Sequence, residues 1–230
     1  MTHAVLFDVD GTLVDSTYPH TLAWWQAFRR ADLDVPMWRL HRCIGMGPDQ
    51  LVPAVTDADV DVDALAESHD AIYSTFWPSL RALPGARDLV RRCHDSGLVT
   101  VLASSAGSRE VQVIRGLLDC DDALDHATSS DDADDSKPAP DLVSVAVRRA
   151  GVDAAEVVFV GDAVWDVHAC VEAGVTCIGL ECGGTSAAEL EEAGAAAVFR
   201  DPADLLARIG SSPLGTSQGE PVASPSRVTT

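Results

Sequence analysis

Short apolar runs alternate with amphipathic stretches over most of the chain. The uninterrupted runs predict strands that are buried on both faces of a sheet, and they lie at residues 4–7, 98–103, 157–160 and 175–180. Weaker strand candidates lie at 126–130 and, as an edge strand, at 195–199. Apolar residues at helical spacing occur between the strands, at 87–97, 108–119, 140–151, 163–174 and 186–194. This alternation predicts an α/β fold in which helices cover both faces of a parallel sheet.

One long segment, 17–81, breaks this rhythm because it contains no convincing strand. Two stretches within it, 20–33 and 62–77, place aromatic and aliphatic residues at helical spacing. We therefore expect an inserted α-helical cap at 17–81 and a sheet-containing core formed by 1–16 and 82–210. The aromatic residues are expected to form the interior of the cap rather than a box around a substrate, and they are Trp24, Trp25, Phe28, Trp38, Phe76 and Trp77. A cleft between two such units is the usual place for a ligand.

The charge of the chain restricts its partners. The 16 Lys and Arg residues against 36 Asp and Glu residues give a formal net charge of −20. Such a surface repels nucleic acid and anionic membranes, so neither is expected as a partner. It also repels phosphorylated metabolites unless a local cation or a bound metal reverses the field. The oligomeric state stays open between a monomer and a homodimer.

The sequence indicates neither a targeting segment nor a disulfide framework. Residues 1–9 contain no basic segment followed by a long apolar one, and no uncharged apolar run approaches the roughly 18 residues of a membrane span. The six cysteines include no Cys-x-x-Cys pair and are expected to be reduced, mostly buried thiols of a cytoplasmic protein. Residues 211–230 are rich in Ser, Gly, Pro and Thr, which predicts a disordered tail.

The strongest chemical signal is AVLFDVDGTLVDS, residues 4–16. An apolar strand ends at Asp8, and Asp10 follows two residues later, before a glycine turn. Because ligands gather at the carboxyl ends of parallel strands, both carboxylates are expected to project into a site. A calcium-binding loop does not fit, because the glycine stands at the fourth position rather than the sixth and Pro19 occupies the twelfth.

The stretch VVFVGDAVWDV, residues 157–167, repeats this geometry. Asp162 follows an apolar strand, and Asp166 comes four residues later, on the same face of a helical turn. Taken alone, this pair also fits a helix cap and a first-turn acid that faces the helix dipole. Two strand ends that each deliver two carboxylates form a cluster that is unstable without a cation, and oxygen ligands suit Mg²⁺. The predicted metal ligands are therefore Asp8, Asp10, Asp162 and Asp166.

Two further segments are candidates for anion binding. The run LVTVLASSAGS, 98–108, ends a strand in hydroxyl residues, and Ser104 and Ser105 stand where backbone amides at a helix start can hold an anion. Lys137, the only lysine of the chain, precedes two prolines at an expected helix start. Each pattern also has an explanation without a ligand: a serine that caps a helix, and a solvated loop lysine.

Together these four motifs resemble those of the haloacid dehalogenase superfamily of phosphatases and phosphomutases. DVDGT, the serine of LASSA, the lysine of SKPAP and GDAVWD occur in the family's order, and the resemblance runs from about residue 4 to 209. The insertion after the first strand matches the helical cap of the family. KPAPD and DGTLVDS are most similar to the phosphoglycolate phosphatase and β-phosphoglucomutase branch. The resemblance implies a Rossmann-like core, a small phosphorylated metabolite as substrate, and a Mg²⁺-dependent hydrolase.

The resemblance also implies a role for each residue. Asp8 matches the nucleophile that takes the phosphoryl group, and Asp10 matches the general acid and base that protonates the leaving oxygen and then activates water. Ser104 matches the hydroxyl that holds phosphate, and Lys137 matches the cation that bridges nucleophile and phosphate. The metal contacts that it implies are Asp162, Asp166 either directly or through water, and the backbone carbonyl of Asp10.

A phosphomutase is the main enzymatic alternative. His20 stands early in the first expected cap helix, where β-phosphoglucomutase-like proteins carry a histidine, although a partly exposed helix histidine is equally expected there. Arg42 can substitute for the arginine with which the mutase loop grips phosphate, but CIGMGPDQL, 43–51, is more similar to the cap loop of the phosphatases. This loop, with Gly45, is expected to face the active site and shape specificity. Its Gly45-x-Gly47 pair lacks the third glycine and the preceding buried strand of a dinucleotide fingerprint.

Two other classes fit less well. Dehalogenases of the same superfamily lack the second aspartate of the first motif, which is present here as Asp10. Phospho-aspartate receiver modules also combine clustered aspartates, a hydroxyl residue and a lysine, but in another order and without a helical insertion. The sequence therefore favours a phosphatase that hydrolyses a small phosphate monoester, such as phosphoglycolate or a sugar phosphate.

Overall fold

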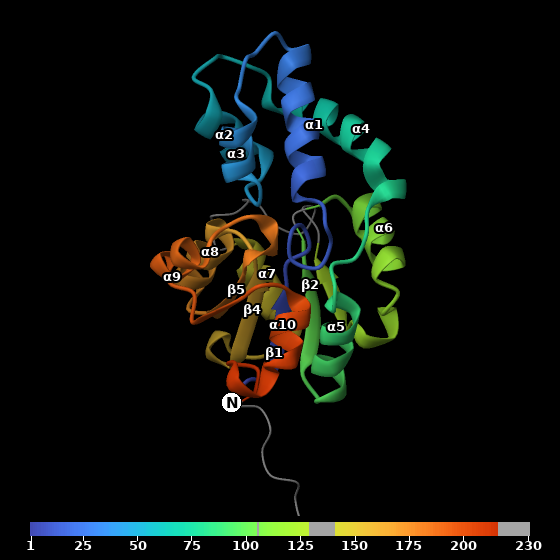
Figure 1. The fold of residues 1–230 in the computed structure, drawn as a ribbon, viewed down its shortest axis with the longest axis vertical. Coiled ribbons are helices and arrows are strands. Elements are labelled where there is room, and N and C mark those ends of the chain that lie inside the picture. Colours follow the sequence, from blue (N-terminus) through green and yellow to red (C-terminus); the bar gives the residue numbers. More distant parts are fainter. Residues whose placement is uncertain (105, 129–140, 216–230) are drawn as a thin grey trace, which may run out of the picture.

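A six-stranded parallel sheet forms the centre of the computed structural model, which describes residues 1–104, 106–128 and 141–215 (Figure 1). The strand order is β3-β2-β1-β4-β5-β6. The strands are β1 (Ala4–Phe7), β2 (Val99–Ala103), β3 (His126–Thr128), β4 (Val157–Gly161), β5 (Thr176–Leu180) and β6 (Ala197–Phe199). All six correspond to predicted strands, and the two weaker candidates form the two edges of the sheet.

Helices cover both faces of this sheet, as predicted. Side chains of β1 alternate between two apolar clusters, with Val5 and Phe7 in one and Ala4 and Leu6 in the other. The first cluster contains side chains of α5 (Ala86–Asp95), α6 (Ser108–Leu118) and α10 (Pro202–Ala207). The second contains side chains of α7 (Asp141–Ala150), α8 (Val164–Ala173) and α9 (Ala187–Ala193). The apolar pattern does not predict α10, because six residues are too few to display a helical period.

Four of the helices between β1 and β2 in the chain gather at one end of the molecule, at the top of Figure 1. They are α1 (Thr17–Arg30), α2 (Met37–Cys43), α3 (Pro48–Val55) and α4 (Val62–Tyr73), followed by the 3₁₀ helix η1 (Ser74–Ser79). The helical insertion is therefore confirmed, and its division from the core at 17–81 stays a prediction. The two short helices α2 and α3 were not predicted, because each has seven or eight residues and little periodicity of its own.

The aromatic residues of the cap mostly pack inward. Trp24 and Phe28 are buried, and Trp25, Phe76 and Trp77 are partly buried against the same apolar cluster. Trp38 is 69% exposed, so the prediction that it belongs to the cap interior is wrong. The buried side of α2 is formed by Leu40 and Cys43, and Trp38 projects from the opposite side of that helix.

The C-terminal segment departs from the predicted disordered tail. Leu214 is buried in the core, and the Pro213 carbonyl accepts a hydrogen bond from the Thr2 hydroxyl at 3.2 Å. The prediction is therefore wrong for residues 211–215, because one apolar side chain and local hydrogen bonds anchor them. Residues 216–230 lie outside the described residues.

The cysteines are mostly buried, as the sequence predicted. All six cysteines lie in the described residues as free thiols, and five of them are buried. Burial raises the pKa of the Cys93 thiol to about 12, so this thiol is unreactive near neutral pH. No helix in the described part of the chain is long and apolar enough to cross a membrane.

Candidate active site

Three buried aspartates meet at the carboxyl end of the sheet. Asp8 follows β1, and Asp162 follows β4, which pairs with β1. Asp166 stands in the first turn of α8, which begins shortly after β4. One carboxylate oxygen from each residue lies within 4.8 Å of the other two, and all three side chains are buried. The pairing of β1 with β4 thus gathers carboxylates that are far apart in the sequence.

The backbone approaches this cluster closely and fixes it. A methyl group on Gly183 would lie only 1.6 Å from Asp162 Oδ2, so a larger residue cannot stand there unless the carboxylate moves. The Thr12 hydroxyl donates a hydrogen bond to Asp162 Oδ1 at 2.9 Å. The Ala163 N–H donates to Asp166 Oδ2 at 3.1 Å. These contacts orient two of the three carboxylates in advance of any ligand.

The donor set fits a divalent cation that prefers oxygen ligands. Three buried carboxylates at this separation repel one another, and a bound cation removes that repulsion. Small hard cations such as Mg²⁺ bind carboxylate oxygens in preference to nitrogen or sulfur. Asp10 was the fourth predicted ligand, but its side chain belongs to a different cluster, with His20 and Glu110. A metal contact through the Asp10 backbone carbonyl therefore stays a prediction.

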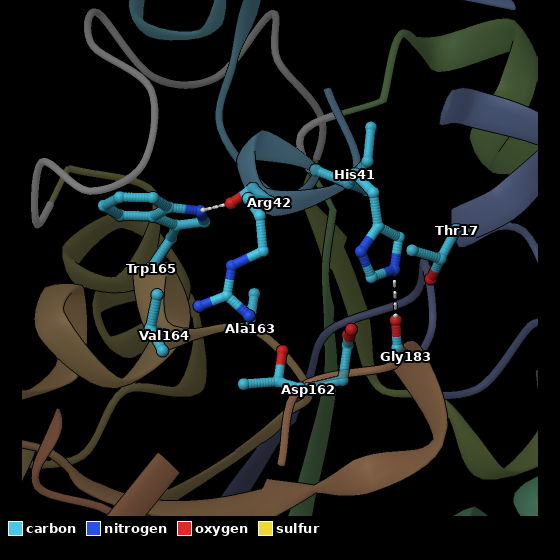
Figure 2. A pocket seen from close by; sticks show the side chains of 10 residues that line it. Thr17, His41, Arg42, Asp162, Ala163, Val164, Trp165 and Gly183 are labelled. Atoms are coloured by element: carbon cyan, nitrogen blue, oxygen red, sulfur yellow. Dashed lines mark hydrogen bonds between the residues drawn. The ribbon is translucent and has the colours of Figure 1, made fainter. Parts of the chain in front are cut away.

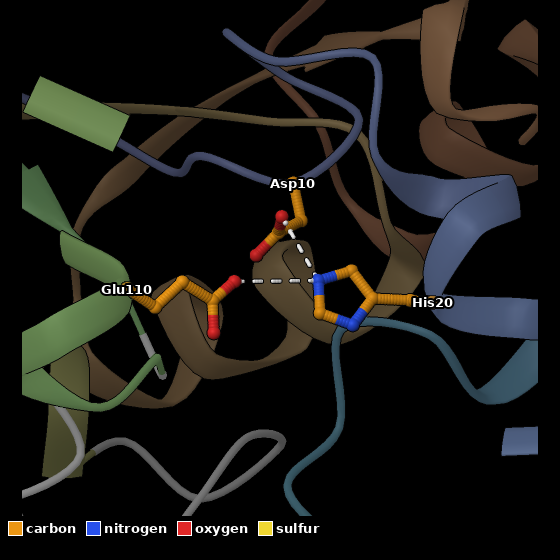
Figure 3. Close-up of side chains that lie close together, drawn as sticks. All are labelled: Asp10, His20 and Glu110. Carbon is orange, nitrogen blue, oxygen red and sulfur yellow. Dashed lines mark hydrogen bonds and ion pairs between the residues drawn. The ribbon is translucent and has the colours of Figure 1, made fainter. Parts of the chain in front are cut away.

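The Asp10 carboxylate is held by Ser16 from the following loop and by His20 from the cap, and Figure 3 shows the second contact. Ser16 Oγ donates to Asp10 Oδ1 at 2.5 Å, and His20 Nε2, from the first turns of α1, lies 3.1 Å from the same oxygen. Glu110 Oε1, from the first turn of α6, lies 3.7 Å from His20 Nε2. The His20 side chain is only 12% exposed, so the structure places it against Asp10 rather than in solvent.

Two histidines form a chain that leads from this cluster to the surface. His20 Nδ1 lies 3.1 Å from His69 Nε2, and His69 Nδ1 lies 2.9 Å from Asp70 Oδ1. The Tyr73 ring stacks on His20, with 3.7 Å between ring centroids, and the Trp24 ring stacks on His69 at 4.4 Å. A neutral His69 that donates from Nδ1 to Asp70 must accept at Nε2. His20 therefore donates from Nδ1 to His69.

The local charges agree with this assignment. Burial opposes the protonated form of His20, but the carboxylates of Asp10 and Glu110 outweigh it and raise the pKa of His20. Burial lowers the pKa of His69 to about 4, so His69 is neutral at pH 7. Burial and the neighbouring Asp10 charge raise the pKa of Glu110 to about 7. These shifts favour a protonated imidazole at His20, between the carboxyl groups of Asp10 and Glu110.

The low pKa of His69 predicts a loss of stability in mild acid. The unfolded chain protonates this histidine near pH 6.5 and the folded chain near pH 4, so the unfolded state binds more protons between these values. Stability is fully present above pH 6.5 and falls by about 3 kcal/mol from this group as the pH drops to 4. Urea unfolding at several pH values should show a clearly flatter acid slope for His69→Gln than for the wild type. The exposed His126 offers the matched control His126→Gln, which should keep the wild-type slope; equal slopes for His69→Gln and the wild type would contradict the prediction.

A cavity of about 370 Å³ opens between the sheet and the cap. Its walls include Asp8, Asp10, His20, Trp24, Gly45, His69, Asp70 and Glu110. Ser104 follows β2 directly and is buried, and its hydroxyl accepts a hydrogen bond from the Ala106 N–H at 3.1 Å. Ser105 and Lys137, the other predicted phosphate contacts, lie outside the described residues. Trp24 packs in the cap interior and also lines the cavity, so for this residue a place in the cap interior and a contact with substrate are compatible.

Sequence reasoning did not single out His69, Asp70 or Glu110. His69 stands four residues after Leu65 and three before Ile72, on the buried side of α4. A polar residue on an apolar helix face is the signal that can identify such a position. Glu110 has no comparable signal, because an acid in the first turn of a helix is ordinarily explained by the helix dipole.

Beside Asp162 of the aspartate cluster, hydrogen bonds hold α2 against the core (Figure 2). Trp165 Nε1 donates to the Arg42 carbonyl at 3.0 Å, and His41 Nε2 donates to the Gly183 carbonyl at 3.2 Å. The Arg42 guanidinium pairs with Glu189 at 2.5 Å. Arg42 lines a separate, smaller hollow rather than the large cavity, and its ion pair with Glu189 argues against a grip on a second phosphate.

Comparison with known proteins places this site in a family. A family model described as haloacid dehalogenase-like hydrolase matches residues 2–174, which contain every predicted site residue. This chain belongs to the haloacid dehalogenase-like hydrolases. It is 31% identical to a phosphoglycolate phosphatase of Pseudomonas putida over 193 residues, 78% of this chain and 69% of that protein. It is 26% identical to the fructose-1-phosphate phosphatase of Escherichia coli, over 76% of this chain and 94% of that protein.

A solved structure shows the same architecture. A hydrolase from Pseudomonas syringae superposes with a TM-score of 0.87 at 33% identity, and the match covers 92% of this chain and 99% of that one. These findings confirm the predicted family, the fold with a helical insertion, the enzymatic class of hydrolase, and the similarity to phosphoglycolate phosphatases. The roles of individual residues stay predictions, and so does the identity of the metal.

Proposed function

We propose that this hydrolase is a Mg²⁺-dependent phosphatase that hydrolyses a small phosphate monoester through a phosphorylated Asp8. The observation that carries the proposal is the grouping of Asp8 with Asp162 and Asp166 at the carboxyl end of the sheet, where Asp8 and Asp10 line the cavity between sheet and cap. The phosphatases among its relatives, which act on phosphoglycolate and fructose 1-phosphate, support a small phosphorylated metabolite as substrate.

The first chemical step needs a nucleophile and a proton. An oxygen of Asp8 attacks phosphorus, the bond to the ester oxygen breaks, and an aspartyl phosphate forms. Asp10 gives a proton to the departing oxygen, so that the product leaves as a neutral alcohol. Mg²⁺ bound at the three carboxylates would lower the repulsion between the nucleophile and the phosphoryl oxygens. Ser104 and Lys137 are the predicted partners of the phosphoryl group.

The second step reverses the role of Asp10. The Asp10 carboxylate takes a proton from water, the water oxygen attacks phosphorus, and Asp8 is released with inorganic phosphate. Ser16 and His20 hold Oδ1 of Asp10 from the loop and from the cap. Their two contacts keep the carboxyl group directed at the same place during both steps.

A phosphomutase is the second candidate, and His20 beside Asp10 is the observation that favours it. A mutase must also bind a second phosphate through the cap. Arg42, the residue considered for that task, is paired with Glu189 outside the cavity. The phosphatase therefore has the stronger support.

Turnover of p-nitrophenyl phosphate tests the proposal. We expect release of p-nitrophenol that requires Mg²⁺ and stops when EDTA is added. Absence of Mg²⁺-dependent release between pH 5 and 9 would overturn the phosphatase. β-Glucose 1-phosphate separates the two candidates, because release of inorganic phosphate supports the phosphatase, whereas conversion to glucose 6-phosphate without phosphate release supports the mutase.

A further inference from the structure

The wall of the cavity around Asp10 is acidic. Asp70 and Glu110 line it together with the rings of His20, Trp24 and His69. Among the described residues that line this cavity there is no arginine or lysine. The whole chain carries a net charge of −20, which adds to the negative field at this wall. The described wall therefore offers carboxylates and imidazoles to the part of a substrate that lies beyond Asp10.

Glu110 presents an acceptor that the described residues do not satisfy. Its Oε1 is buried without a hydrogen-bond partner among them, because His20 Nε2 is 3.7 Å away, too far for a good bond. The Tyr73 hydroxyl, also buried without a hydrogen-bond partner among them, interacts with the Glu110 carboxyl group but forms no hydrogen bond of good geometry with it. A buried acceptor without a donor costs free energy, and a hydroxyl group of a ligand can supply that donor.

The position of Glu110 relative to Asp10 determines which part of a bound substrate Glu110 contacts. Ligand atoms of Asp10, His20 and Glu110 all lie within 4.8 Å of one another (Figure 3). In the proposed function, Asp10 contacts the ester oxygen that leaves. Glu110 then stands beside the first carbons of the alcohol that this oxygen carries.

We propose that this site selects phosphate monoesters of neutral, hydroxyl-bearing alcohols, with Glu110 accepting a hydrogen bond from a substrate hydroxyl, and that it disfavours esters whose alcohol carries a carboxylate. The inference rests on the proposed phosphatase function and narrows its substrate class. A carboxylate at the second carbon would approach Glu110, and His20, the nearest described group in that wall that can carry a positive charge, is already held by Asp10. A hydroxyl at the same place repels nothing and satisfies Oε1.

One nearby cation provides the competing explanation. Arg109 lines an adjoining hollow of about 240 Å³, to which Asp70 and Glu110 also belong. Its guanidinium lies over the Trp77 ring, 5.2 Å from the ring centroid. If a substrate carboxylate were bound in this enzyme, Arg109 would be the described residue to bind it, so its variant serves as the control.

Three phosphate esters of two carbons each make the comparison sharp. 2-Hydroxyethyl phosphate, ethyl phosphate and phosphoglycolate share the phosphate and the first carbon and end in a hydroxyl, a methyl and a carboxylate. At pH 8, where the Glu110 carboxylate is ionised, kcat/KM should be highest for the hydroxyl ester and lowest for phosphoglycolate, with about tenfold or more between them. Phosphoglycolate hydrolysed as well as or better than 2-hydroxyethyl phosphate would overturn the inference. If none of the three esters nor p-nitrophenyl phosphate were hydrolysed, the proposed function itself would fail instead.

Two variants test whether Glu110 causes the preference for the hydroxyl ester. Glu110→Gln keeps the shape of the side chain and removes its charge, so the ratio of kcat/KM for 2-hydroxyethyl phosphate over phosphoglycolate should fall about tenfold. Arg109→Gln should leave that ratio as in the wild type. An unchanged ratio in Glu110→Gln, with a melting temperature equal to the wild type, would overturn the role of Glu110. A selective loss of phosphoglycolate turnover in Arg109→Gln would show that Arg109 binds the carboxylate and would overturn the inference.

Discussion

Replacing Asp8 with asparagine is expected to lower turnover of every substrate by at least about 10⁴-fold, because the amide cannot form the phosphorylated intermediate. The fold should survive, since Asp8 is one of three mutually repelling carboxylates and its neutralisation relieves that repulsion. We therefore expect a melting temperature, measured without metal, that equals or exceeds that of the wild type. Steady-state assays with p-nitrophenyl phosphate and thermal unfolding check both parts.

The matched control is Asp15→Asn, the same substitution at an exposed position of the same loop. It should retain wild-type turnover and wild-type stability. Substantial activity in Asp8→Asn would remove Asp8 as the nucleophile. A much lower melting temperature in Asp8→Asn would instead contradict the expected mutual repulsion of the three carboxylates.

Replacing Asp162 with asparagine is expected to abolish the response to Mg²⁺ and to lower kcat/KM by about 10³-fold. The wild type should gain thermal stability as Mg²⁺ is added, because a cation that binds only the folded state stabilises it by mass action. Asp162→Asn should show little or none of this gain. Differential scanning fluorimetry over a Mg²⁺ series measures the gain independently of catalysis.

Glu172→Gln is the control for that experiment, because it removes an exposed carboxylate from α8, the helix that also carries Asp166. It should keep both the Mg²⁺-dependent gain in stability and the activity. If Asp162→Asn retained the full gain, the cation would bind elsewhere, and the cluster of three aspartates would not be the metal site.

The core of this fold was predictable because strands of a parallel sheet are buried on both faces. Such strands appear as short, uninterrupted apolar runs, and 4–7 and 157–160 differ from the final β1 and β4 by at most one residue. The cap was less predictable. Its short helices α2 and α3 owe their conformation to packing against their neighbours, and on α2 the aromatic Trp38 faces solvent against expectation.

The candidate site likewise contains residues that the sequence predicted and residues that it did not. Asp8, Asp10, Asp162 and Asp166 were found from motif spacing, since each follows a strand whose end is visible in the sequence. His69 and Glu110 were not found. They meet His20, the partner of Asp10, only because α4 and α6 are both placed beside the first turns of α1, and no local pattern specifies that placement.

The sequence by itself determined which side chains stand at strand ends, because burial of a strand and the turn after it are encoded by neighbouring residues. Only the tertiary structure decided that β1 lies beside β4, so that Asp8 meets Asp162 and Asp166. It also decided that the Asp10 carboxylate turns away from this cluster, towards His20 and Glu110. These outcomes depend on contacts between segments far apart in the chain, and such contacts are set by packing of the whole molecule rather than by local periodicity.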